Sequence, residues 1–239
     1  MKVFQTLAVG MLIGAITRGG FAASGLPAQA PSDAARSSAA ARTPTLPKDV
    51  YADSLNRLPL IKRENLDEAG KKLYDSIVSG KSFQRAGLQG PPGIRIHSPR
   101  EAALMSTRGT SSVPAPGERL MELAVLVTAR EMNSQYEWTA HEPTAVKAGL
   151  APATIDVVRF RKDITGLGEK EAAIIQLGRE MFGKNKVSSD TFARALKLFG
   201  EGELVNLVVH MGDYSGTALL LRTFDQQLRP GWKPLLPIP

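Results

Sequence analysis

The sequence predicts an all-α protein: a single helical domain of antiparallel helix hairpins, preceded by a signal peptide and a flexible tether. From about residue 50 to residue 228, apolar side chains recur every three or four positions, as they do along one face of a helix. No segment shows the alternation of apolar and polar residues that predicts a half-buried strand. Short segments with glycine and proline separate the helical stretches, which favours antiparallel neighbours.

The first residues have the composition of an export signal. Lys2 supplies the positive start, a mostly apolar run follows, and small residues precede Ala23. We expect residues 1–23 to be a cleaved signal peptide, with the mature protein beginning between Ala23 and Pro31 in the periplasm or outside the cell. A buried N-terminal helix and an uncleaved anchor are the alternatives. Arg18 interrupts the apolar run, which leaves it too short for a membrane span of about 20 residues.

The composition changes after the signal. Residues 24–48 are rich in Ala, Ser, Pro and Thr and have almost no large apolar side chains, which predicts a flexible tether. Residues 49–239 are enough for one domain with its own core. The formal net charge of +7 indicates first of all a feature that keeps the protein in solution, and steering of an anionic small-molecule partner is the second interpretation. No run of Lys and Arg with interleaved aromatic residues is present, so no nucleic-acid partner is expected.

Capping residues and helix breakers bound the first two predicted helices. Asn65 is the expected cap of a helix that ends at Gly80. Residues 81–96 contain several glycines and a pair of prolines, which predicts a loop. Pro99 suits the first turn of the next helix, which runs to about Thr107.

Six more helices are predicted after a second loop at residues 108–117. Their expected ranges are 118–130, 133–148, 152–160, 169–182, 190–199 and 202–224. Pro143 lies inside the second of them, where it removes a backbone hydrogen bond and predicts a kink. Ser189 is the expected cap of the fifth, and Gly200 is expected to end it. The last helix is apolar around much of its circumference, so we expect it to be central or shared with another subunit.

Four side chains that can carry chemistry stand at fixed intervals within this helical sequence. Glu122 precedes Ser134 by twelve positions, and Glu137 and His141 follow Ser134 by three and seven. At about 3.6 residues per turn, the last three share one helix face. A carboxylate four residues before an imidazole can hydrogen-bond to it, fix its tautomer and favour its charged form.

The segment with these four residues resembles the carboxymuconolactone decarboxylase and alkylhydroperoxidase-like superfamily. In that superfamily, a helix ending in a glutamate leads to a second helix with the motif Cys-x-x-Cys-x-x-x-His. Glu122 and His141 match this spacing, whereas Ser134 and Glu137 stand where the two cysteines would be. The resemblance extends over about residues 55–228. It implies an alkylhydroperoxidase-like fold and a homo-oligomer, a trimer or a hexamer.

The chain contains no cysteine, so it lacks the thiolate that peroxidase turnover in this superfamily requires. The resemblance then implies cofactor-free acid–base chemistry: decarboxylation, isomerisation or a lyase step on a small carboxylated or lactone-like molecule. His141 would be the acid or base, and Glu137 or Glu122 would orient it. Ser134 would donate a hydrogen bond to developing charge. The alternative function is that of a non-catalytic helical binding or scaffold protein that lost the redox cysteines.

Each of these residues has a structural alternative. Glu122 can instead form an ion pair with Arg119 or Arg130, or lie exposed at the edge of its helix. His141 can be a surface residue paired with Glu137, a common decoration of helices. The joint spacing of the four residues favours proton transfer over these alternatives.

Three further residues are weaker candidates for substrate binding. The resemblance places His97 near the substrate pocket, although capping or packing is its ordinary role. Trp138 and Tyr136 lie on the same predicted helix as His141, with Trp138 on another face of it. His210 is expected to be a core or interface residue.

No metal or cofactor site is expected. His141 and Glu142 resemble the start of a zinc-protease motif, but Ala145 occupies the position of the second histidine ligand. The paired Glu-x-x-His units of di-iron bundles are missing, and the glycine-rich segment at residues 87–93 lacks the lysine of a phosphate-binding loop.

Overall fold

The computed structural model describes residues 46–80, 87–108 and 116–238. Within these ranges all regular elements are helices, and the strand-like pairing is limited to one isolated bridge between Tyr51 and Asn56. The predicted all-α class is therefore confirmed. Residues 46–239 form one compact unit.

The predicted signal peptide and the tether up to residue 45 lie outside the described residues. The helices of the described part are the 3₁₀ turn η1 (Arg63–Asn65), α2 (Glu68–Val78), α4 (Pro91–Arg95), α5 (Pro99–Arg108), α6 (Glu118–Glu131), α7 (Gln135–Lys147), α8 (Pro152–Arg159), α9 (Glu169–Gly178), the π-helical turn η2 (Arg179–Gly183) and α10 (Ser189–Thr223).

Three sequence predictions about helix boundaries are corrected. The Asp67 side chain, and not Asn65, caps α2, because its carboxylate accepts from the Gly70 N–H at 2.7 Å. Ser188, one residue before the expected Ser189, caps α10. The short helix α4 lies inside the segment predicted to be a loop. Its first two residues are prolines, whose fixed φ suits a first helical turn.

The longest helix contains the predicted break. Gly200 has φ +72°, a left-handed conformation, so the range Ser189–Thr223 consists of two helical segments that meet at this glycine. The second segment is the long apolar helix that the sequence predicts. The helix α7 continues past Pro143 to Lys147.

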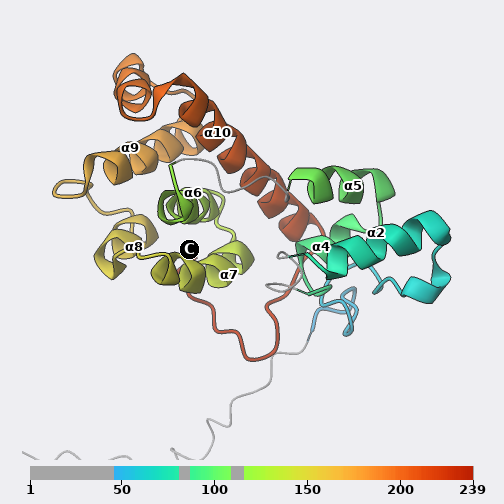
Figure 1. Cartoon of the computed structure of the whole chain (residues 1–239). Coiled ribbons are helices and arrows are strands. Elements are labelled where there is room, and N and C mark those ends of the chain that lie inside the picture. The colour runs from blue at the N-terminus through green and yellow to red at the C-terminus, as the bar shows by residue number, and fades with distance from the viewer. Residues whose placement is uncertain (1–45, 81–86, 109–115, 239) are drawn as a thin grey trace, which may run out of the picture. The chain divides into compact units, whose positions relative to one another are not determined.

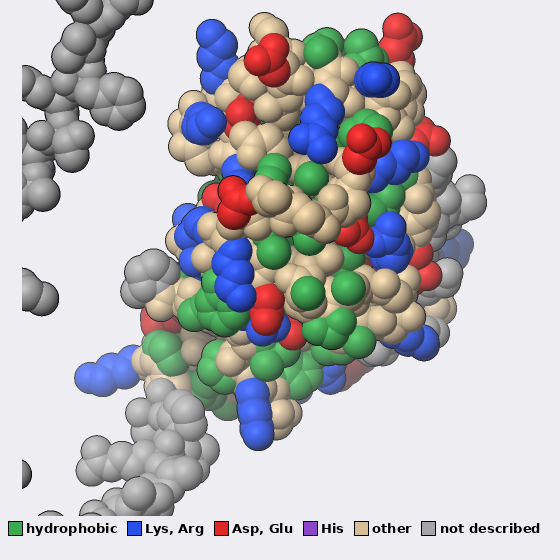
Figure 2. Space-filling model, turned by 90° about the vertical axis from the view of Figure 1, so that its left-hand side faces the viewer, with side chains coloured by type: hydrophobic (Ala, Val, Ile, Leu, Met, Phe, Trp, Pro, Cys, Tyr) green, Lys and Arg blue, Asp and Glu red, His purple; other side chains and the backbone are tan. Residues whose placement is uncertain are grey.

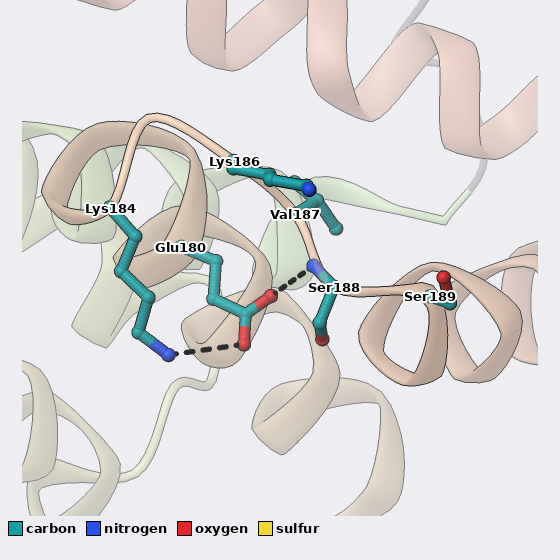
Figure 3. Close-up of a pocket in the computed structure, with 6 residues that line it drawn as sticks. All are labelled: Glu180, Lys184, Lys186, Val187, Ser188 and Ser189. Atoms are coloured by element: carbon teal, nitrogen blue, oxygen red, sulfur yellow. Dashed lines mark hydrogen bonds and ion pairs between the residues drawn. The ribbon is translucent and has the colours of Figure 1, made fainter.

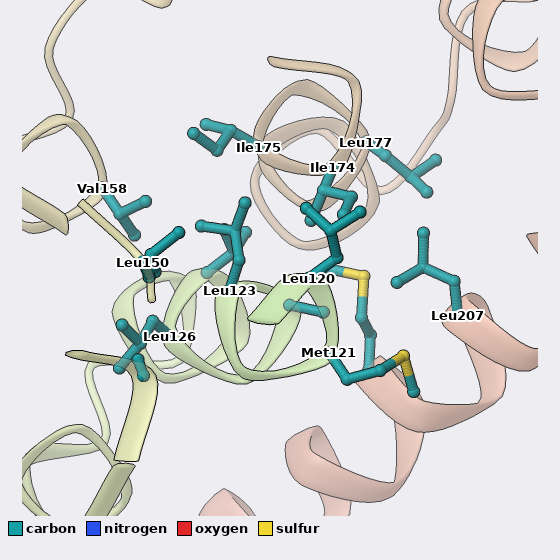
Figure 4. Close-up of a cluster of buried hydrophobic side chains, with 14 of the residues drawn as sticks. Leu120, Met121, Leu123, Leu126, Leu150, Val158, Ile174, Ile175, Leu177 and Leu207 are labelled. Atoms are coloured by element: carbon teal, nitrogen blue, oxygen red, sulfur yellow. The ribbon is translucent and has the colours of Figure 1, made fainter. Parts of the chain in front are cut away.

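The helix α6 is the centre of the packing, with α7, α8, α9 and α10 arranged around it (Figure 1). Every residue from Leu120 to Arg130 is buried. The apolar side chains of α6 meet those of the four surrounding helices in one continuous core (Figure 4), of which Leu123, Ile174 and Leu207 expose no surface. A polar side chain between Leu120 and Arg130 is therefore removed from water and needs a partner in the protein interior.

The helices α2, α4 and α5 pack together near the C-terminal end of α10 (Figure 1). Acidic and basic side chains alternate on the face shown in Figure 2 and do not gather into a patch of one sign. In the part of the chain that the structure describes, we find no helix that is both long enough and apolar enough to cross a membrane.

Gly178 on α9 marks the closest approach of three helices. A Cβ atom at this position would lie 2.3 Å from Val127 Cγ1 on α6 and 2.8 Å from Met211 Cε on α10. We therefore expect Gly178→Ala to lower the free energy of unfolding by about 1–3 kcal/mol, because overpacking forces the helices apart. Denaturant unfolding measures this change.

Gly202→Ala is the matched control for this substitution. Gly202 is also helical, but a Cβ atom there would have no neighbour within 4 Å. Alanine should therefore stabilise the protein by about 0.5–1 kcal/mol, through its lower loss of backbone entropy. Equal effects of the two substitutions would contradict the close approach of α9 to α6 and α10.

Candidate active site

Glu122 on α6 and His141 on α7 form a buried carboxylate–imidazole pair. The distance between Glu122 Oε2 and His141 Nδ1 is 2.8 Å. The two residues expose 8% and 5% of their surface. The carboxylate thus acts on one ring nitrogen, and with Glu122 ionised this nitrogen carries the proton and donates it to Oε2.

The alternative partners considered for Glu122 are engaged elsewhere. The Arg119 guanidinium pairs with Glu171 on α9, and Arg130 donates to the backbone carbonyl of Pro237 at 2.9 Å. The imidazole that Glu122 contacts is buried, so the surface position considered for it is wrong. Because both arginines have other partners, Glu122 on α6 pairs with His141 on α7, as the sequence spacing favours.

A tight turn between α6 and α7 brings the pair together. Asn133 has φ +50°, in the left-handed region that asparagine tolerates better than most residues. The backbone N–H groups of Met132, Asn133 and Ser134 donate to carbonyls of the last turns of α6 at 2.9, 3.2 and 2.7 Å. The chain reverses over these three residues, so α7 packs back along α6 with His141 beside Glu122.

Ser134 and Glu137 form a second unit at the start of α7. Ser134 is the N-cap residue of this helix, and its side chain hydrogen-bonds to the Glu137 carboxyl group. Glu137 exposes 2% of its surface, and its buried Oε2 atom has no hydrogen-bond partner among the described residues. Burial raises the pKa of Glu137 well above its ordinary value, whereas the Arg95 charge and the Ser134 hydrogen bond oppose the rise.

Glu122 and not Glu137 is therefore the carboxylate that holds the imidazole. The sequence left both open, because Glu137 is four residues before His141 on one helix face. Among the described contacts no hydrogen bond joins Glu137 to His141, so Glu137 is not the carboxylate that orients the imidazole. The pKa of Glu137 is raised because water is excluded from its surroundings.

The helix α10 adds two aromatic side chains that the sequence analysis missed. The Tyr214 ring lies edge-on to His141, with centroids 5.0 Å apart and planes at 90°. The same ring also contacts His210, with centroids 4.9 Å apart and planes at 61°. The spacing of four residues between His210 and Tyr214 places them on one helix face, which is the sequence signal that could have identified them.

Arg95 contributes a cation from α4. Its guanidinium donates to Thr217 Oγ1 on α10 at 2.6 Å. Burial lowers its pKa, and the charges of Glu137, Tyr214 and Asp213 oppose this change. Sequence reasoning placed this residue in a loop, so it gave no signal for a role beside the site.

Two residues predicted to bind substrate belong to the core. Trp138 exposes no surface, and its indole N–H donates to the Glu142 carboxylate at 2.6 Å. Tyr136 donates its hydroxyl to the Gln89 carbonyl at 2.5 Å and packs against the Trp232 ring. Their large apolar rings fill the interior on both sides of α7, which explains why both are enclosed.

The third predicted substrate contact, His97, has no described contact with the buried pair. It is exposed after α4, with Nε2 3.0 Å from the Pro59 carbonyl oxygen. In the described residues no group of three or more His, Asp or Glu side chains is arranged to hold a metal ion.

A pocket of about 480 Å³ lies at the turn between η2 and α10 (Figure 3). It contains none of the predicted site residues. Glu180 accepts from the Ser188 backbone N–H at 2.7 Å and from Lys184 at 3.4 Å. The backbone hydrogen bond from Ser188 lowers the pKa of Glu180 to about 2. These groups already satisfy one another, so we assign them to the stability of the turn.

The raised pKa of Glu137 predicts how stability depends on pH. In the unfolded chain this carboxyl group ionises near its ordinary pKa of 4.5, whereas the native state keeps its proton to higher pH. The contribution of this group to the free energy of unfolding is therefore most favourable below its unfolded-state pKa of 4.5. It is lost as the pH rises from there through the native pKa. Glu137→Gln should therefore raise the free energy of unfolding increasingly with pH, as measured by denaturant unfolding at several pH values.

Glu142→Gln is the comparison for this substitution, since Glu142 is also on α7 but is paired with Arg159. It should destabilise the protein at neutral pH. A loss of stability in Glu137→Gln, constant from acid to neutral pH, would mean that Glu137 is not the protonated carboxyl group assigned here.

No protein-family model matches the sequence, and no curated protein matches it. The site is thus defined by its own geometry. It consists of a buried carboxylate–imidazole pair between α6 and α7, a phenol and a second imidazole on α10, and a buried carboxyl group near a cation.

Proposed function

We propose that the protein is an exported enzyme of the carboxymuconolactone decarboxylase-like kind, which carries out acid–base chemistry without a cofactor. The reaction is a decarboxylation, an isomerisation or a lyase step on a small carboxylated or lactone-like molecule. The observation that carries this proposal is the buried contact of 2.8 Å between Glu122 Oε2 and His141 Nδ1. In addition, the chain has no cysteine for thiol chemistry.

The geometry of the pair suits proton transfer. Glu122 holds Nδ1, so Nε2 is the ring nitrogen that can exchange a proton without breaking the contact. The carboxylate favours the imidazolium form, and burial strengthens this interaction relative to water. Loss of carbon dioxide, or of a proton next to a carbonyl, leaves an enolate-like carbanion. An imidazolium aimed at that carbon can protonate it, which typically contributes about 10²–10⁴-fold to the rate.

The neighbouring groups fit auxiliary roles. Ser134 and Glu137 hydrogen-bond to each other, and with Glu137 protonated one O–H group of the two is left to donate to developing negative charge on a substrate oxygen. Arg95 supplies positive charge close to Glu137, which agrees with an anionic substrate. The α6–turn–α7 arrangement supports the proposed relationship to the superfamily, because its Glu and His positions are in contact.

We further propose that the protein forms a homo-oligomer through α10. Three apolar side chains on one stripe of this helix, those of Val205, Val209 and Leu219, are 52–60% exposed. Between them lie Gly212 and Gly216, where an added Cβ atom would have no neighbour within 4 Å. Such a stripe allows close approach of a second helix and costs free energy if it stays in water.

The rival function is that of a non-catalytic binding or scaffold protein. Its support is that Trp138 and Tyr136 fill the core instead of lining an open pocket. In that case the Glu122–His141 pair would only link two helices. Activity measurements on variants of the pair separate the two functions.

The activity test uses a panel of small lactones and oxo acids with the full chain, followed by NMR for loss of carbon dioxide or exchange of carbon-bound protons. We expect His141→Ala and Glu122→Gln each to lower turnover by about 10²–10⁴-fold. The double variant should be little slower than either, because members of one unit are not additive. Ser134→Ala should cost less, since it removes one donor and not the proton carrier.

His97→Ala is the control, because this exposed histidine contacts only the Pro59 backbone among the described residues. It should keep full activity. The test requires a substrate that the unmodified chain converts. If His141→Ala converts this substrate at an undiminished rate, the Glu122–His141 pair has only a structural role, and the scaffold function is favoured.

A further inference from the structure

We infer that His210 is a second proton-transfer residue of this site: its imidazole takes a proton from one carbon of the substrate while His141 supplies a proton at another. This assignment rests on the proposed acid–base function and narrows it. Decarboxylation needs only a group that donates a proton to the carbanion. An isomerisation needs one group that removes a proton and one that returns it, and the site holds two imidazoles in different environments.

Both imidazoles lie against the same phenol. The Tyr214 ring has its centroid 5.0 Å from that of His141 and 4.9 Å from that of His210. His141 comes from α7, whereas the other two residues come from α10. Tyr214 therefore contacts both imidazoles, which places His141 and His210 within one small group of side chains where each can reach a different carbon of the same bound molecule.

Neighbouring residues of α6 hold the two imidazoles in different ways. The Glu122 carboxylate holds Nδ1 of His141 at 2.8 Å. The Met121 backbone favours the protonated form of His210, and Nε2 of His210 has no hydrogen-bond partner among the described residues. We assign the backbone contact to Nδ1, which leaves Nε2 of the neutral ring as an acceptor. A carboxylate favours a charged imidazolium, whereas a neutral carbonyl fixes a neutral ring with its proton on Nδ1. The first ring is thus suited to donate a proton and the second to accept one.

The unpaired nitrogen of His210 is the feature that a purely structural role leaves unexplained. Its Nε2 atom is buried and has no hydrogen-bond partner in the described part of the chain. A buried polar atom without a partner is unfavourable and rare in folded proteins. An acceptor kept in this state is ready to take a hydrogen from a bound molecule.

The charges around His210 keep it neutral. Burial lowers its pKa, and the His141 charge acts in the same direction. The carboxylates of Glu122 on α6 and Asp213 on α10, together with the Met121 backbone, oppose this effect. Because the folded-state pKa lies below the ordinary value of 6.5, the ring is uncharged at neutral pH and remains a proton acceptor.

The proposed step balances without any further reactant. His210 Nε2 removes a proton from the carbon next to a lactone carbonyl, and the electron pair of that C–H bond forms the double bond of an enolate. The enolate then takes a proton from His141 Nε2 at the far end of its conjugated system, which moves the carbon–carbon double bond. His210 leaves the step protonated and His141 neutral, and exchange with water restores both.

The first test is substrate-free and follows the three histidines of the full chain by ¹H–¹⁵N NMR during a pH titration. We expect His210 to gain its proton below the ordinary imidazole pKa of 6.5, with the Nδ1–H tautomer in its neutral form. Glu122→Gln should shift the His210 titration to still lower pH, and His97→Gln should leave it unchanged. A His210 that titrates at or above 6.5, or that ignores Glu122→Gln, overturns the assignment.

The second test uses α-angelica lactone, whose conversion into its α,β-unsaturated isomer requires removal of a proton at one carbon and addition at another. We expect His210→Gln and His141→Gln each to slow isomerisation and incorporation of solvent deuterium by about 10²-fold or more. His97→Gln is the control.

The outcomes separate the two claims. Isomerisation that survives His210→Gln but is lost in His141→Gln would reject the role of His210 and keep the proposed function. If neither this lactone nor the panel of oxo acids is converted by the unmodified chain, the proposed function fails. The NMR titration still decides whether His210 is the neutral member of a coupled pair.

Discussion

The structure depends on the burial of α6. Because α7, α8, α9 and α10 surround this helix, a charged side chain on it has no access to bulk water over most of its length. Glu122 is in that position, and an isolated buried carboxylate would be strongly unfavourable. The imidazole of His141 compensates for this cost, so the same contact that makes the packing possible also creates a group able to move protons.

Several backbone features help to position the contact between Glu122 and His141. The left-handed Asn133 reverses the chain between α6 and α7 and sets the register in which position 141 meets position 122. Gly178 lets α9 and α10 approach α6 closely, which brings His210 and Tyr214 towards the pair. The groups with perturbed pKa values, Glu137 and His210, lie where these helices exclude water.

Much of the architecture follows from local signals in the sequence. The periodicity of apolar residues predicts α6 and α7 closely, and Gly200 predicts the break in α10, because helix faces and left-handed glycines are local properties. The cap of α2 and the helix α4 were mispredicted, because the local signals at these positions are compatible with more than one structure. Several neighbouring residues can satisfy the same helix end, and a proline pair is compatible with either a loop or a first helical turn.

The site was predictable only in part. The spacing of Glu122 and His141, taken together with the superfamily that it resembles, singles out these two residues. It cannot decide between two carboxylates that can both reach one imidazole. That choice depends on how far α7 turns relative to α6. The contributions of Arg95, His210 and Tyr214 come from segments distant in sequence, whose approach is set by tertiary packing. Trp138 was misjudged because an aromatic side chain beside a site and one in the core have the same helical spacing.

The central claim is that Glu122 and His141 form one interacting unit in the interior. A double-mutant cycle of Glu122→Gln and His141→Gln, measured by equilibrium unfolding at neutral pH, tests it most directly. The structure predicts a coupling free energy of about 1–3 kcal/mol, because each single substitution leaves the other buried group without its charged partner. Effects that add to within about 0.5 kcal/mol would mean that the two side chains do not interact, and would contradict this description of the site.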